Sequence, residues 1–147
     1  QVSGRAGREE KVGRVLLQSY MTEHPVIRAL VKGDRDGFLA AELAGRSAAR
    51  MPPFARLASL IISSRTERLA ETVAADLARA APREDEVEVF GPAPAPIAQL
   101  RGQFRFRLLV KASRKLNLQT ILRGWLASVS WTRSTNVRVD MDPYSFM

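Results

Sequence analysis

The sequence predicts an α+β domain with two layers, an antiparallel sheet and two helices that pack on one of its faces. Three patterns carry this prediction. β-Forming residues fill 57–64, apolar residues recur every four positions over 66–80, and apolar and basic residues alternate over 103–112. Together with strands at 87–91 and 137–141 and a helix from 113 to about 129, they give the order βαββαβ, the split-βαβ or ferredoxin-like arrangement.

An extension of one strand and two helices is predicted before this domain. Residues 14–20 form the predicted strand. A short helix over 25–32 has proline at its first position, where the missing N–H costs nothing. A second helix over 34–50 begins with an aspartate suited to the N-cap, and the proline pair after Met51 ends it.

The two helices of the βαββαβ domain are predicted from their apolar faces. Ser113 is expected to cap the second of them. Between the helices, residues 82–86 form an acidic turn and residues 92–96 alternate proline and alanine, a pattern typical of an extended segment. The apolar faces consist of Leu69, Val73 and Leu77 in the first helix and Leu118, Leu122, Trp125 and Val129 in the second.

The strand at 103–112 separates its side chains into an apolar set and a basic set. Successive side chains of a strand point to opposite faces of the sheet. We expect the apolar set to pack under the helices and the basic set to lie on the open face. The apolar set is Phe104, Phe106, Leu108 and Val110. The basic set, with Arg101 just before it, gives the candidate nucleic-acid-binding residues Arg101, Arg105, Arg107 and Lys111.

The spacing of the two phenylalanines favours contact with a nucleic-acid backbone over base stacking. An RNA-recognition domain has the same βαββαβ order and places aromatic residues after an Arg-Gly pair, where they stack on bases. Here the aromatics are one residue out of phase and point into the core. An alternative stays open, in which the basic residues pair with acids such as Glu88 or Asp140, or dock on another domain.

Charge and composition agree with a polyanionic partner. The 147-residue chain has a net charge of +8, and residues 101–147 alone hold 9 basic and 2 acidic side chains. There is no cysteine and a single histidine, so we expect neither disulfides nor a metal site. No apolar run approaches the ~20 residues of a membrane helix, so we expect no membrane partner. The absence of cysteine agrees with the cytoplasmic location that we expect.

A second candidate site follows Ser113. Two cations at a predicted helix start, with Gln119 one turn later, would bind a phosphate or a carboxylate. An acidic peptide would suit this site, although a simple solvated helix start explains the same residues. The candidate peptide-binding residues are Arg114, Lys115 and Gln119.

The first eight residues, with the form Q-x-x-G-R-x-G-R, resemble motif VI of superfamily 2 helicases. The chain begins inside this motif, so we expect it to be a piece of a longer protein. Further segments in the same order resemble the primosomal protein N′ family of replication-restart helicases. These are His24–Leu30, residues 38–46 leading into Pro-Pro-Phe at 52–54, the Phe-Gly-Pro segment at 90–97, residues 100–107, and the closing Val139-Asp140-Met141-Asp142-Pro143.

This resemblance implies an ATP-dependent 3′→5′ DNA helicase that restarts stalled replication forks. The intact protein would use ATP and Mg, with zinc in an upstream region that is absent here. By the resemblance, Arg5 and Arg8 would be catalytic, facing the γ-phosphate of ATP. The nucleotide-binding residues would be Gln1, Gly4, Arg5 and Arg8.

For the chain itself, the resemblance implies a domain for binding and not for catalysis. Residues 1–22 would be a remnant of the second RecA-like helicase lobe, 23–54 a helical linker, and 55–147 a C-terminal domain similar to ribosomal protein S10. Expected partners are DNA, as a fork or a single strand, the tail of the single-stranded-DNA-binding protein and other primosome proteins. We expect no cofactor and no ATPase activity in the chain alone. An interdomain scaffold and a ribosomal-like RNA-binding domain are the alternatives.

Overall fold

The computed structural model describes residues 15–143. The chain falls into two compact units, Gln1–Gly45 and Arg46–Met147. Within the described residues, no helix has the length and apolar character needed to cross a membrane. The three-part division of the chain given above concerns a longer protein and stays a prediction.

The first unit holds the two helices predicted before the main domain, α1 (Pro25–Lys32) and most of α2 (Arg35–Ala48). The His24 side chain accepts a hydrogen bond from the Val26 N–H and caps α1. Gly33 ends α1 with a left-handed backbone, φ +67°. The carboxylate of Asp34 accepts from the Gly37 N–H at 2.8 Å, which confirms it as the cap of α2.

The strand predicted at 14–20 is wrong for the residues that the structure describes. Residues 15–20 do not form a strand. A strand is stable only when a neighbour pairs with its N–H and C=O groups, and within 15–143 no strand lies outside the four-stranded sheet of the second unit. Leu16 and Tyr20 are accordingly exposed and not packed. An apolar run alone did not distinguish a strand from an unpaired segment.

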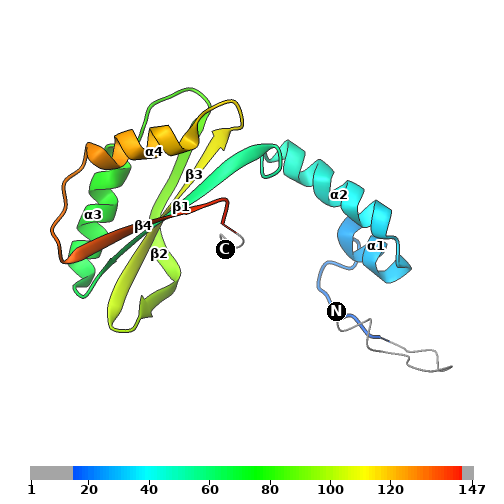
Figure 1. Ribbon diagram of the computed structural model, residues 1–147. Helices are drawn as coiled ribbons and strands as arrows, with labels where there is room; N and C mark the ends of the chain where they lie inside the picture. The colour runs from blue at the N-terminus through cyan, green and yellow to red at the C-terminus, as the bar shows by residue number, and fades with distance from the viewer. Residues whose placement is uncertain (1–14, 144–147) are drawn as a thin grey trace, which may run out of the picture. The chain divides into compact units, whose positions relative to one another are not determined.

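The second unit confirms the predicted βαββαβ order. Its elements are β1 (Ala55–Ser64), α3 (Glu67–Arg79), β2 (Val87–Leu100), β3 (Gln103–Ser113), α4 (Leu118–Ala127) and β4 (Thr135–Met141). The strands form one sheet in the order β2-β3-β1-β4, and every neighbouring pair is antiparallel. Figure 1 shows α3 and α4 together on one side of this sheet, which is the two-layer arrangement.

The core lies between the sheet and the two helices. Trp125, predicted as a core residue, is buried, and its Nε1–H donates to the Leu77 carbonyl oxygen at 3.1 Å. This bond joins α4 to the last turn of α3, where a helix has carbonyl groups without partners of its own. The buried cluster is Ala58, Leu60 and Ile62 of β1, Ala70, Val73, Ala74 and Leu77 of α3, Leu108, Val110 and Ala112 of β3, and Leu118, Leu122 and Trp125 of α4.

Two boundaries differ from the sequence expectation by more than two residues. β2 continues through the Pro-Ala segment to Leu100, because β2 is an edge strand and an edge strand tolerates missing N–H groups. α4 begins at Leu118 with Asn117 as its cap, whose Oδ1 accepts from the Thr120 N–H at 3.2 Å. Ser113 is not the cap, because it is the last residue of β3 and is aligned with Ala55 of β1.

Candidate nucleic-acid and peptide surfaces

The phase predicted for β3 is confirmed. Leu108 and Val110 are fully buried, and Phe106 packs against the same core cluster. Phe104 lies near the start of the strand, aligned with Ser64, and is half-buried. Arg105 and Arg107 alternate with these residues and therefore lie on the face opposite α3 and α4. The phenylalanines are thus unavailable for base stacking on the open face.

Arg101 is placed by a tight hairpin between β2 and β3. Arg101 and Gly102 have φ values of +51° and +72°, and the flanking residues Leu100 and Gln103 are paired. Two successive left-handed residues between paired strands are the signature of a type I′ turn. A residue other than glycine in this left-handed conformation costs roughly 1 kcal/mol of stability. The hairpin therefore holds an arginine at its tip in an unfavourable backbone conformation.

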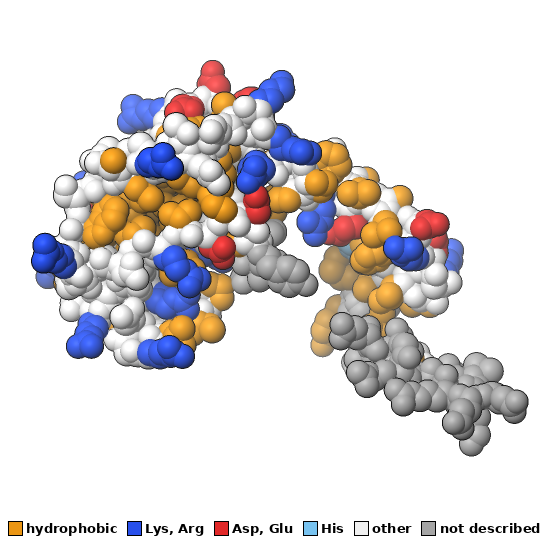
Figure 2. Space-filling model, viewed as in Figure 1, with side chains coloured by type: hydrophobic (Ala, Val, Ile, Leu, Met, Phe, Trp, Pro, Cys, Tyr) orange, Lys and Arg blue, Asp and Glu red, His pale blue; other side chains and the backbone are white. Residues whose placement is uncertain are grey.

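Three arginines surround one concavity of about 310 Å³ on the open face of the sheet. Arg101 comes from the hairpin tip, Arg105 from β3 and Arg138 from β4. In Figure 2, Lys and Arg side chains gather over the part of this unit where Figure 1 labels β2. The other residues that line the concavity are Ile61, Ser63, Leu100, Gln103 and Asn136.

Arg138 was missed by the sequence analysis, which treated 137–141 only as a closing strand. Val137 and Val139 pack against the core, and Arg138 between them faces the other way. The same alternation that separated the side chains of 103–112 would have found it. Ile61 of β1 is aligned with Arg107 on one side and with Arg138 on the other, so the two arginines flank it in one row across the sheet.

Lys111 lies toward the opposite end of β3 and has acidic and aromatic neighbours. Its Nζ is 3.2 Å from a Glu88 carboxylate oxygen, 3.4 Å from the Ala49 carbonyl oxygen and 5.5 Å from the centre of the Phe90 ring. Its side chain is only 14% exposed. Glu88 also binds Arg50 at 2.6 Å. Lys111 is thus not among the residues around the concavity, and Glu88 is the pairing partner that the alternative reading named.

The predicted peptide-binding residues are only partly brought together. Lys115 and Gln119 line a second concavity of about 330 Å³, with Arg56 and Met141 beside them. Arg114 is not part of its lining, and its Nη1 donates to the Pro53 carbonyl oxygen at 3.2 Å. Because α4 begins at Leu118, both cations of the predicted pair precede the helix.

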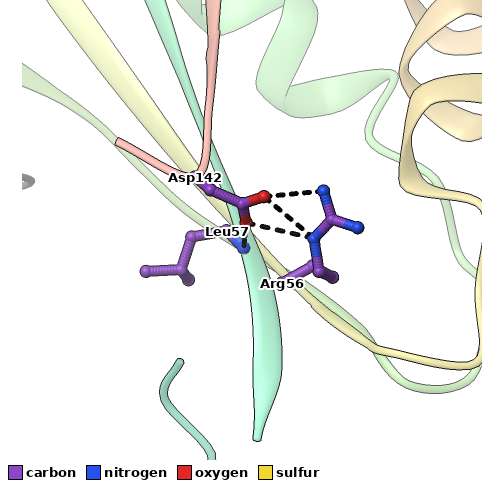
Figure 3. Close-up of polar contacts among 3 residues, drawn as sticks. All are labelled: Arg56, Leu57 and Asp142. Atoms are coloured by element: carbon purple, nitrogen blue, oxygen red, sulfur yellow. Dashed lines mark hydrogen bonds and ion pairs between the residues drawn. The ribbon is translucent and has the colours of Figure 1, made fainter. Parts of the chain in front are cut away.

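Arg56, which sequence reasoning did not single out, is held by Asp142 (Figure 3). The Arg56 Nη2–H donates to an Asp142 oxygen at 2.6 Å, and the same carboxylate accepts from the Leu57 N–H at 3.3 Å. The hydrogen bond from Arg56 has the largest effect and lowers the pKa of Asp142. Burial opposes it, and the bond from Leu57 lowers the pKa further. The same pairing raises the pKa of Arg56. In the sequence, Asp142 was marked by its place in the closing Val-Asp-Met-Asp-Pro segment, and nothing there indicated Arg56 as its partner.

The nucleotide-binding expectation falls outside the described residues. Gln1, Gly4, Arg5 and Arg8 all precede residue 15. Over residues 15–143, no three His, Asp or Glu side chains gather into a group that would hold a metal ion.

The fold defines a two-layer βαββαβ domain with arginines on its open sheet face. Residues 47–144 match the family model described as primosomal protein N C-terminal domain, and the chain belongs to that family. This confirms the resemblance drawn from the sequence motifs.

Relatives named replication restart protein PriA match almost the whole chain. The protein of Rickettsia conorii is 40% identical over 146 residues, which are 99% of this chain and 22% of the relative. The proteins of Treponema pallidum and Bacillus subtilis are 34% and 30% identical over the full chain, which covers 23% and 19% of their lengths. The chain thus spans about a fifth of the length of these relatives.

Proposed function

We propose that the βαββαβ domain is a DNA-binding and partner-binding module of a replication-restart helicase. The observation that carries the proposal is the convergence of Arg101, Arg105 and Arg138 around one concavity of the open sheet face. The name that the relatives share, replication restart protein, supports DNA as the polyanion.

Arginines on a sheet face suit the DNA backbone. Side chains two residues apart on a strand, such as Arg105 and Arg107, are about 6–7 Å apart, and those on neighbouring strands are slightly closer. A guanidinium keeps its charge and donates two parallel hydrogen bonds to phosphate oxygens. Binding of this kind does not depend on sequence and weakens steeply as salt displaces the protein from the phosphates. Lys111, held by Glu88, is expected to contribute little.

Fluorescence anisotropy of the chain with a labelled DNA fork at two salt concentrations tests the proposal. Replacing Arg101 and Arg105 with alanine should weaken binding and reduce the salt slope by about one unit per lost phosphate contact. The matched control replaces Arg68 and Arg123, exposed residues of α3 and α4, and changes the net charge equally. Equal losses in the two double variants would reduce the effect to net charge and refute the sheet-face site.

The concavity beside α4 is proposed to bind an acidic peptide such as the tail of the single-stranded-DNA-binding protein. Lys115 and Arg56 supply positive charge there, and Gln119 supplies an amide. Met141 adds an apolar wall. Asp142 neutralises part of the Arg56 charge, so Lys115 is the cation that we expect to contribute most.

Titration of a labelled acidic peptide with a free C-terminal carboxylate tests this second surface. The double variant Lys115→Ala with Gln119→Ala should lose peptide binding and keep DNA binding. Arg114→Ala is the control, because Arg114 lies outside the lining and bonds Pro53. A larger loss from Arg114→Ala than from the double variant would overturn the assignment.

The catalytic role of the whole protein is a separate proposal. The intact helicase would hydrolyse ATP with Mg, hold zinc in an upstream region, and place Arg5 and Arg8 at the γ-phosphate. We propose that the chain alone hydrolyses no ATP, and that other primosome proteins are partners of the intact protein. Phosphate release by the pure chain with Mg-ATP and forked DNA would refute the first of these. In the intact protein, Arg8→Ala should abolish turnover and leave ATP binding weakened but measurable.

An interdomain scaffold is the competing function, and two exposed apolar side chains favour it. Ile97 is 56% and Leu100 is 45% exposed, and both lie on β2 toward the hairpin that carries Arg101. A surface that docks on another domain would use such side chains. If the Arg101 and Arg105 variant bound DNA as tightly as the parent chain at both salt concentrations, the scaffold would be the better account. The RNA-binding alternative has less support, because the β3 phenylalanines face the core.

A further inference from the structure

The open face of the sheet is covered at one end and accessible at the other. Leu57 and Ser59 of β1 belong to this face, yet they are only 1% and 4% exposed. The segment before β1 lies near that end, since Lys111 contacts the Ala49 carbonyl oxygen. Further along β1, Ile61 and Ser63 are half-buried and line the concavity between the arginines. The accessible end is therefore a bounded site and not a flat basic surface.

The lining of this concavity has three chemical parts. Arg101, Arg105 and Arg138 supply cations. Ile61 and Leu100 supply an apolar floor and wall. Gln103 and Asn136 supply amide groups, each with both a donor and an acceptor. A surface that bound phosphates alone would need only the first part.

We propose that this concavity takes one unpaired nucleotide of a single DNA strand, with Arg138 as a phosphate-binding residue. The inference rests on the DNA binding proposed above and adds the form of DNA. A nucleotide has a phosphate for the arginines, an apolar base face for Ile61 and Leu100, and a polar base edge for the amides. A duplex stacks its base faces and pairs its base edges, so it can use the arginines alone.

The residues that line the concavity also determine which forms and sequences of DNA it should prefer. It contains no aromatic side chain, so a base would rest on aliphatic groups and guanidinium planes without an aromatic platform. Asn and Gln side chains can each donate and accept, so they can adapt to more than one base edge. We therefore expect a preference for single strands over duplexes with little preference among sequences.

The test compares a labelled 15-nucleotide single strand with a duplex of the same length, using the 147-residue chain at one salt concentration. The single strand should bind about tenfold more tightly, since a good amide contact to a base edge contributes a preference of about this size. Leu100→Ser removes an exposed apolar group without touching the core. It should weaken single-strand binding several-fold and leave duplex binding unchanged.

Arg138→Gln tests the residue that the inference adds. It should weaken single-strand binding and reduce the salt slope by about one unit. The matched control is Arg133→Gln, which removes one charge from an exposed turn outside the concavity and should have a much smaller effect. If Arg138→Gln behaves like Arg133→Gln, the assignment of Arg138 is wrong.

The outcomes separate this inference from the proposed function. Equal, salt-dependent binding of single strand and duplex, unchanged by Leu100→Ser, would overturn the nucleotide site and leave DNA binding by the sheet face intact. Binding of neither DNA, or binding that does not respond to salt, would refute the proposed function and the nucleotide site together.

Discussion

Arg56, near the start of β1, and Asp142, directly after β4, are joined by a guanidinium–carboxylate pair between residues 86 positions apart in the chain. The Arg56 Nε lies 3.1 and 3.0 Å from the two carboxylate oxygens, and Nη2 lies 2.6 Å from one of them. The Asp142 N–H also donates to the Leu57 carbonyl oxygen at 2.8 Å. The pair thus fixes the end of the last strand against the first.

Stability should fall in acid partly through Asp142. Its pKa is lowered in the folded protein, first by the hydrogen bond from Arg56. A carboxyl with a depressed folded pKa stabilises the fold fully above its unfolded pKa of about 3.9 and loses this contribution as pH falls through the folded value. Asp142→Asn should therefore be less stable than the parent chain at neutral pH, and the difference should shrink below about pH 4.

Urea unfolding of both proteins at pH 7 and pH 3 measures this. Asp140→Asn is the control, because the described residues give Asp140 no ion pair of this kind. A difference between parent and Asp142→Asn that is the same at both pH values would show that Asp142 acts only through geometry.

Arg101 should lower the stability of the domain, although its side chain contributes to DNA binding. Asparagine tolerates the left-handed backbone at φ +51° better than arginine does. Arg101→Asn should therefore raise the free energy of unfolding by about 0.5–1 kcal/mol and weaken DNA binding. Thermal unfolding and anisotropy on the same sample check both effects, with Arg133→Asn as the control. A variant that is both less stable and weaker in binding would show that the arginine also supports the hairpin.

The two phenylalanines of β3 should differ in their contribution to stability. Phe106 packs against the buried cluster, so Phe106→Ala should cost about 3 kcal/mol, the lower end for buried aromatic residues. Phe104 is half-buried at the start of the strand and lies outside that group, so Phe104→Ala should cost distinctly less. Denaturant unfolding measures both. A larger loss for Phe104 would contradict the packing described here.

Gly91 is predicted to be irreplaceable in the bulged part of β2. Its φ is +102°, and a Cβ atom at this position would lie 2.8 Å from the Arg107 carbonyl oxygen. Gly91→Ala should therefore destabilise the domain by about 2 kcal/mol or more. Gly45→Ala is a matched control, since a Cβ there meets no atom within 4 Å. Similar stability of the two variants, measured by thermal unfolding, would show that the backbone of β2 shifts to admit the Cβ atom with little loss of stability.

Periodicity predicted the helices and strands that pack against each other. It failed at boundaries and segments whose structure does not depend on burial. The alternation in β3 and the spacing of Leu69, Val73 and Leu77 in α3 both reflect burial. The start of α4 was misplaced because Ser113 and Asn117 are equally suited to capping, and only the sheet register shows that Ser113 still belongs to β3. The strand predicted at 14–20 lacked a pairing partner, which no local pattern reveals.

The sequence predicted which arginines lie on the open face of each strand, but it did not predict which of them share a concavity. Alternation placed Arg105 and Arg107 on the open face, and it applied equally to Arg138, but it did not show which strands would be neighbours. The alignment of Ile61 with both Arg107 and Arg138 exists only once β1 lies between β3 and β4. Lys111 satisfied the same alternation, yet the fold places Glu88 beside it.

The prolines of β2 make the two edges of the sheet unequal. β2 and β4 are both edge strands, and each offers unpaired backbone groups to any extended chain that meets it. Pro92, Pro94 and Pro96 remove three N–H donors from β2, whereas β4, with the sequence Thr-Asn-Val-Arg-Val-Asp-Met, has all of its own. Self-association through strand addition is therefore discouraged along the proline segment of β2, whereas β4 offers a further strand a series of donors that no proline interrupts.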